Sequence, residues 1–112
     1  MNQERRQYGR AKSPVLIEFG QGSAIERSFT YDISEGGLRF PTTAELRVGQ
    51  ELVLTLDLPQ QERCQATAQV VWIRELAKIG ATQYDVGVRF RWMEDPDRQR
   101  LRRHLQPLLK KV

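Results

Sequence analysis

Cysteine and histidine are almost absent from this chain of 112 residues, which contains only Cys64 and His104 of these two types. One cysteine excludes an internal disulfide, and a metal site normally needs several cysteine or histidine ligands. We therefore expect neither a metal nor a cofactor, and a reducing compartment fits this composition. No Ser–His–Asp order, carboxylate pair or glycine-rich phosphate loop before a helix stands out. We therefore expect a protein that is not an enzyme.

Long hydrophobic runs are also missing. No segment reaches the roughly 18 consecutive apolar residues that a membrane-spanning helix requires, and no apolar stretch follows the basic start, so we expect neither membrane insertion nor a signal peptide. Hydrophobic residues make up 39% and charged residues 29% of the chain, values close to ordinary globular usage. This length and composition predict one cytoplasmic domain.

The net charge of +4 is concentrated at the two ends of the chain. Residues 1–12 and residues 94–112 each carry a net charge of +3, whereas residues 13–93 carry −2. Fourteen of the eighteen cationic residues are arginine. Because the planar guanidinium matches phosphate groups and base edges, this bias favours recognition of an anion.

Alternation of apolar and polar residues predicts six short strands separated by glycine- and proline-containing turns. Val71 and Ile73 make both faces of the fifth strand apolar near its end, which predicts a bulge there or a cover from another element. Pro41 is expected to end the third strand. The six predicted strands are Pro14–Phe19, Ile25–Ile33, Leu38–Phe40, Glu51–Leu58, Arg63–Glu75 and Tyr84–Trp92.

A helical period follows the last predicted strand. Asp95 is a suitable N-cap and Pro96 a suitable first helical residue, and leucines then recur at helical spacing. Pro107 is expected to stop or kink the helix near Gln106, which predicts a helix over about residues 95–106, with continuation after Pro107 left open. The fold class is therefore mainly all-β: a six-stranded antiparallel, Greek-key-like β-barrel whose open end or edge the C-terminal α-helix covers.

Two short motifs stand out from this pattern. The first, Arg5-Arg6-Gln7-Tyr8-Gly9-Arg10, is RRxxxR, and the second, Asp32-Ile33-Ser34-Glu35-Gly36-Gly37, is DxSxxG at the junction of a strand and a turn. Together they resemble the signature of the PilZ domain family, whose receptors bind the bacterial second messenger cyclic di-GMP. The segment Gly87–Phe90, followed by an arginine-rich helix, is similar to the family's last strand and helix. The resemblance covers essentially the whole chain and implies a stand-alone member.

The resemblance implies a ligand site whose residue types suit the messenger. An arginine fork can meet guanine O6 and N7, and a carboxylate such as Asp32 can accept from the N1–H and N2–H groups. Guanidinium also pairs with phosphate, and glycines permit positive φ and close backbone approach. Trp72 could flank a guanine or belong to the core, and Arg74 lies on the same strand face. The candidate ligand-binding residues are Arg5, Arg6, Arg10, Asp32, Ser34, Gly36, Gly37, Trp72 and Arg74.

The residue before RxxxR bears on stoichiometry within the family. Arginine at this position, here Arg5, resembles members that bind an intercalated dimer of the messenger, so we expect two ligands per chain. Residues 1–12 are expected to form a ligand clamp that is mobile without ligand, because they have few apolar anchors. The clamp would wrap onto a barrel formed by residues 13–112 and change the surface offered to an unidentified effector protein.

Three other interpretations remain open at this stage. The arginines could form a solvated basic tail. The chain could be a PilZ-like adaptor that binds no nucleotide. It could also be a small β-barrel that binds RNA or single-stranded DNA, which would need a basic sheet face with exposed aromatic residues. The net charge of −2 over residues 13–93, and aromatic residues that we expect to be buried, argue against nucleic acid.

Overall fold

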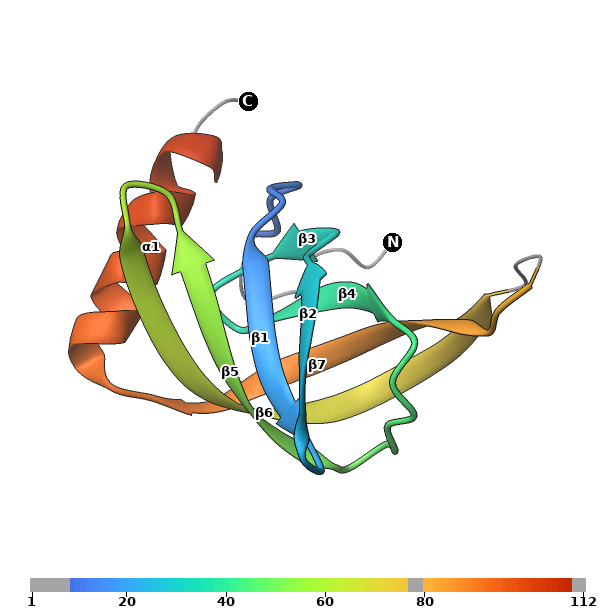
Figure 1. Cartoon of the computed structure of the whole chain (residues 1–112). Coiled ribbons are helices and arrows are strands. Elements are labelled where there is room, and N and C mark those ends of the chain that lie inside the picture. Colours follow the sequence, from blue (N-terminus) through green and yellow to red (C-terminus); the bar gives the residue numbers. More distant parts are fainter. Residues whose placement is uncertain (1–8, 77–79, 110–112) are drawn as a thin grey trace.

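A computed structural model describes residues 9–76 and 80–109, which form seven strands and one helix (Figure 1). All strands pair antiparallel in one sheet of order β2-β1-β5-β6-β7-β4-β3. The sheet curls into a half-barrel, which confirms the predicted class of an antiparallel barrel-like sheet with a C-terminal helix. The elements are β1 Leu16–Gln21, β2 Ala24–Phe29, β3 Asp32–Ile33, β4 Gly37–Thr42, β5 Glu51–Leu58, β6 Glu62–Leu76, β7 Gln83–Met93 and α1 Asp95–Leu109.

The strand predicted over Ile25–Ile33 is in fact two strands, because the chain changes neighbours at Thr30. The buried Thr30 hydroxyl accepts a hydrogen bond from the Val15 amide at 3.0 Å and donates to the Ser13 carbonyl at 2.7 Å. Before this point β2 pairs with β1, and after it β3 pairs with β4. Because the Thr30 hydroxyl competes for backbone hydrogen bonds, the pairing of β2 with β1 ends here. The chain then crosses to pair with β4.

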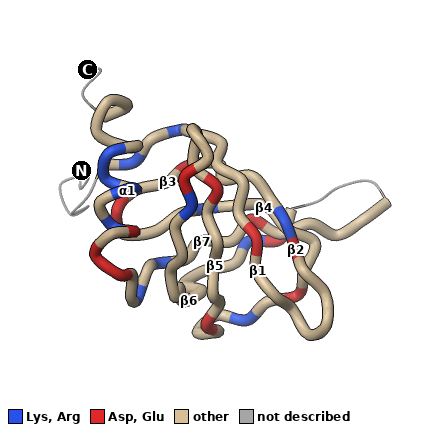
Figure 2. Tube along the Cα trace, turned by 60° about the vertical axis from the view of Figure 1, so that its left-hand side comes forward, with Lys and Arg blue, Asp and Glu red and all other residues tan. Residues whose placement is uncertain are grey.

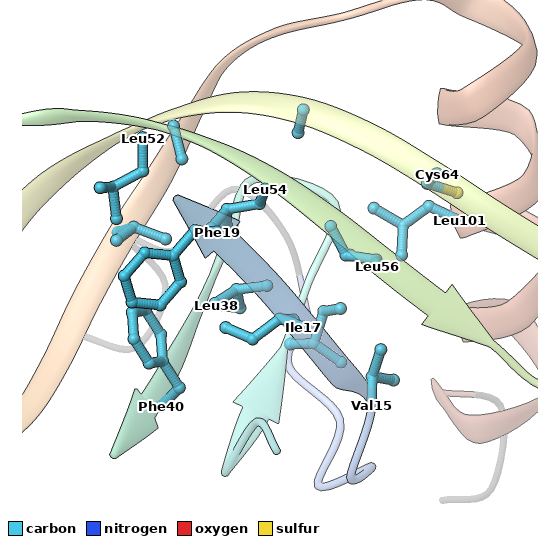
Figure 3. Close-up of a cluster of buried hydrophobic side chains, with 14 of the residues drawn as sticks. Val15, Ile17, Phe19, Leu38, Phe40, Leu52, Leu54, Leu56, Cys64 and Leu101 are labelled. Atoms are coloured by element: carbon cyan, nitrogen blue, oxygen red, sulfur yellow. The ribbon is translucent and has the colours of Figure 1, made fainter. Parts of the chain in front are cut away.

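The core lies inside the curl of the sheet (Figure 3). Alternate residues of β1, β4, β5 and β6 point inward, as the period-2 pattern predicts. The rings of Phe19 and Phe40 meet with centroids 5.6 Å apart at a tilt of 57°, an arrangement that adds to the effect of area burial. Each fully buried large side chain contributes about 1.5–3 kcal/mol to the free energy of unfolding. The core therefore holds together strands that are distant in sequence.

Within residues 9–76 and 80–109, no element forms a second layer over the outer face of the half-barrel. Phe29 and Trp92 are each 58% exposed, Tyr31 is 41% exposed and Trp72 is 40% exposed. The expectation of burial was wrong for Phe29, Tyr31 and Trp92, whereas the position of Trp72 was left open by the sequence. Apolar alternation identifies two strand faces without saying which of them another layer covers. The argument against a nucleic-acid surface therefore rests on the net charge of −2 over residues 13–93 alone.

β6 and β7 pair with two register shifts, one of which passes over Val71. Val70 pairs with Val88, whereas Trp72 pairs with Gly87. The predicted bulge near the end of this strand is thus confirmed. It turns Trp72 onto the outer face, opposite a glycine.

β4 and α1 each continue past a proline. Because Pro41 lies beyond the part of β4 that pairs with β3, its missing N–H removes no ladder hydrogen bond there. α1 runs through Pro107 to Leu109, three residues beyond the expected end at Gln106. Leu109 packs against the core, which stabilises this last turn.

α1 covers one end of the half-barrel (Figure 1). Leu101 and Leu105 are buried, and Leu101 lies beside Cys64 of β6 (Figure 3). No helix among residues 9–76 and 80–109 is long and apolar enough to cross a membrane.

Close packing of β4 against β7 requires a glycine at position 37. A Cβ at this position would overlap the Val88 carbonyl oxygen of β7 and lie 3.0 Å from Arg89 Cα, both rigid backbone atoms. Among described glycines, positive φ occurs at Gly22, Gly49 and Gly80. Gly36 and Gly37 therefore do not use the positive φ that glycine permits, and Gly37 is needed for the close approach of two strands.

We predict that Gly37→Ala lowers the free energy of unfolding by about 1–3 kcal/mol, because strand backbone must shift to admit the methyl group. Urea denaturation followed by circular dichroism measures this change. Gly20→Ala is the matched control, since a Cβ there meets nothing within 4 Å. Equal stability of the two variants would contradict the close approach of β4 to β7.

Candidate functional site

A cavity of about 540 Å³ lies where the segment before β1 meets β3, β4, β6 and β7. Its volume is in the range of small-molecule sites. The lining contains four cationic side chains and one carboxylate, so the cavity favours an anion. The lining residues are Arg10, Lys12, Asp32, Gly36, Gly37, Leu38, Arg39, Val71, Trp72, Gly87, Val88 and Arg89.

Arg10 reaches this cavity because the next residue is tied to β3. The Ala11 amide donates to the Ile33 carbonyl at 2.9 Å, and the Ile33 amide donates to the Ala11 carbonyl at 3.0 Å. Ala11 is also buried. The segment is therefore anchored to the barrel from Ala11 onward, and the expected loose clamp does not extend to residue 12.

Arg10 and Asp32 form an ion pair at the cavity. Arg10 Nε and Nη2 lie 2.8 and 2.6 Å from Asp32 Oδ1. Both side chains are partly buried, with exposures of 27% and 20%. The pair can exchange with solvent or a ligand, and it brings together one residue from each predicted motif, as expected.

The ion pair is the first member of a row of alternating charges across the sheet. Arg39 Nε is 3.3 Å from Asp32 Oδ2, and Arg39 Nη1 is 3.4 Å from Asp85 Oδ2. Arg74 Nη2 is 3.0 Å from the same Asp85 oxygen. The guanidinium carbon of Arg39 also lies 4.7 Å from the centre of the Tyr31 ring. Charges of both signs are scattered over the sheet as a whole (Figure 2), so this row is a local feature of the site.

Trp72 contributes an aromatic surface to the cavity. A Cβ on Gly87 would overlap indole atoms Cε2 and Nε1 of Trp72, so the ring lies directly over this glycine. The indole is 40% exposed and is a lining residue. A partly exposed indole beside arginine forks can stack on a purine.

Ser34 has a local structural role. Its buried hydroxyl accepts from the Gly36 amide at 3.1 Å and donates to the Gly37 carbonyl at 3.3 Å. These bonds hold the turn between β3 and β4, which brings Asp32 opposite Arg39. Ser34 is not among the lining residues, whereas both glycines are.

The structure does not place all of the predicted site residues at the cavity. Arg5 and Arg6 fall outside the described residues. Arg74 is bound to Asp85 but does not line the cavity.

Sequence reasoning missed Lys12, Arg39, Asp85 and Arg89. Arg39 and Arg89 looked like ordinary strand-face charges, but both line the cavity. A signal for Arg39 was present, because a tight turn at Glu35-Gly36 pairs residues 32 and 39 across a hairpin. Nothing in the sequence indicated that β7 would lie beside β4, which brings in Arg89 and Asp85.

Among the described residues outside this cavity, few features indicate a reactive or metal-binding site. Burial raises the pKa of the Cys64 thiol to about 11, which keeps it protonated and unreactive. Burial lowers the pKa of His104, whose Nε2 lies 3.2 Å from Ser13 Oγ. Within the described ranges, no group of three or more His, Cys, Asp or Glu residues could hold a metal ion.

Comparison with known proteins matches residues 4–106 to the family model of the PilZ domain. No curated protein sequence matches the chain. The solved structures of similar fold include the inhibitor of motility MotI/DgrA of Bacillus subtilis, with a TM-score of 0.79 and 22% identity. That match covers 96% of this chain and 53% of that one, so the chain spans about half the length of MotI/DgrA.

Two further structures of similar fold contain a ligand. The PilZ domain of Escherichia coli YcgR, solved with c-di-GMP, has a TM-score of 0.76 and 22% identity over 95% of this chain and 92% of that one. The MrkH–c-di-GMP complex of K. pneumonia has a TM-score of 0.77 and 18% identity over 94% of this chain and 52% of that one.

The packing of Trp72 on Gly87 can be tested directly. In a Trp92→Phe background, we expect Gly87→Ala to shift the fluorescence emission of Trp72 to longer wavelength, because the added methyl group displaces the indole into water. Gly20→Ala in the same background should leave the emission unchanged. An unshifted spectrum for the folded Gly87→Ala variant would show that the indole does not lie on this glycine.

Proposed function

Because the chain belongs to the PilZ domain family, we propose that it is a receptor for cyclic di-GMP. The observation that carries this proposal is the Arg10–Asp32 ion pair at the margin of an electropositive cavity. Two of the similar structures are described as containing c-di-GMP, and they support the ligand class. The chain acts by binding and not by catalysis.

Each charged group has a separate task in this proposal. Arg10 turns from Asp32 to a guanine O6/N7 edge or a phosphate, and Asp32 accepts from guanine N1–H and N2–H. Trp72 stacks on or flanks a base. Lys12 and Arg89 add positive charge near the phosphates. Ser34 and Gly37 serve the ligand indirectly, by keeping Asp32 at the end of its hairpin.

Arg5 and Arg6 complete the site from the segment before Arg10. We expect Arg6 to act as the second arginine of the clamp, and Arg5 to supply the extra cation that an intercalated ligand dimer needs. This stoichiometry remains a prediction from the RRxxxR motif.

Binding is relayed by a change of surface. Closure of the N-terminal segment over the ligand alters the area around α1, because the two are in contact. Gly9 lies against Leu109, with its Cβ position 3.2 Å from Leu109 Cδ2. Glu35, in the turn after Asp32, also pairs with Arg102 of α1 at 3.1 Å. An effector protein of unidentified class reads the altered surface.

Isothermal titration of cyclic di-GMP tests the proposal. We expect Arg10→Ala, Arg6→Ala and Asp32→Ala each to weaken binding by roughly tenfold to a hundredfold, since each removes one charge-assisted contact. Arg27→Ala is the matched control, because Arg27 pairs with Glu18 on the β1–β2 hairpin, away from the cavity. GMP is the control ligand.

The possible outcomes separate the parts of the proposal. An end point near two ligands per chain would support the role given to Arg5, and an end point near one would refute that role alone. No heat and no thermal shift with folded wild-type protein would refute the receptor and favour an adaptor that binds no nucleotide.

A further inference from the structure

Asp85 is the one charged residue that is buried among those the structure describes. Its Oδ2 accepts from Arg74 at 3.0 Å and lies 3.4 Å from Arg39 Nη1, whereas its Oδ1 is buried without a hydrogen-bond partner. A buried carboxylate is unfavourable unless it is paired. Its position on β7, next to Arg39 of β4, suggests that it holds this arginine in place.

Arg39 is restrained on several sides. Asp85 binds Nη1, the Tyr31 ring lies under the guanidinium at 4.7 Å, and Asp32 Oδ2 lies 3.3 Å from Nε. The last contact has ion-pair distance but not hydrogen-bond geometry, since Nε is buried without a hydrogen-bond partner. Arg39 therefore retains one unused donor, Nε, which lies 3.3 Å from Asp32 Oδ2.

Ligand binding would change the partners of Asp32. In the structure both Arg10 contacts fall on Oδ1, and Arg39 lies next to Oδ2. When Arg10 turns to the ligand, Oδ1 becomes free to accept from a guanine edge. Without a second cation, the carboxylate would rotate toward solvent or follow Arg10.

Resting on the proposed function, we propose that Arg39 is a positioning residue that holds Asp32 Oδ2 while Oδ1 reads the guanine edge, and that Asp85 holds Arg39. When Arg10 turns away, Nε of Arg39 donates a hydrogen bond to Asp32 Oδ2, so the negative charge of Asp32 stays compensated. Arg39 then acts on base selectivity through Asp32. It is fixed on a strand, in contrast to Arg10, which precedes the first strand.

A comparison of two ligands tests this role. Cyclic di-IMP carries hypoxanthine, which lacks the N2 amino group of guanine but keeps both phosphates and the O6/N7 edge. Titration calorimetry of the full chain gives the ratio of the two affinities. We expect Arg39→Met and Asp85→Asn to reduce the preference for cyclic di-GMP by roughly tenfold, the scale of one charge-assisted hydrogen bond. Arg27→Met should leave the ratio unchanged.

Arg39→Lys keeps the proposal testable if Arg39→Met does not fold. A single ammonium keeps the positive charge but lacks a fork that spans Asp32 and Asp85, so we expect it to lower the preference as well. Thermal unfolding checks that each variant is folded.

Equal weakening of both ligands, with the ratio preserved, would overturn the positioning role and leave Arg39 as a phosphate contact or a stabilising residue. In that case the receptor function would stand. Absence of binding by the wild-type chain would overturn the receptor function and this inference together.

Discussion

Two backbone hydrogen bonds between Ala11 and Ile33 determine where the candidate site is. They join the segment before β1 to the outer edge of β3, the last strand of the sheet. Arg10 and Asp32 are the residues next to this bridge in each segment. Because the bridge is made by backbone atoms, it fixes their positions without using their side chains, which remain available to a ligand.

The site supplies its own counter-ions. Asp32 lies between Arg10 and Arg39, and Asp85 lies between Arg39 and Arg74. An anion that enters the cavity therefore competes with carboxylates for arginines that are already partly desolvated. Such exchange favours a ligand that offers acceptors to the arginines and donors to the freed carboxylate, which is the chemistry of a guanine nucleotide. A simple anion offers acceptors alone and would leave Asp32 Oδ1 without a replacement donor.

Much of the fold could be predicted from the periodicity of apolar residues. The inward faces of β1 and β5, the bulge in β6 and the start of α1 follow from local patterns and need no knowledge of the tertiary structure. The predictions that were wrong depended on distant partners. Thr30 divides a predicted strand by bonding to Ser13 and Val15. Continuation of the helix past Pro107 was left open by the sequence, and it occurs where Leu109 packs on the core.

The sequence by itself determined the family, the all-β class, the C-terminal helix and the pairing of an arginine motif with an Asp-containing turn. Only the tertiary structure decided which other charges join them. Arg39 meets Asp32 through the β3–β4 hairpin, and Asp85 and Arg89 enter the site because they pair with Pro41 and Gly37 of β4, 44 and 52 positions away in the chain. The physical reason is that strand periodicity records which face a residue occupies, whereas the neighbour on that face depends on how the sheet curls and which strands pair.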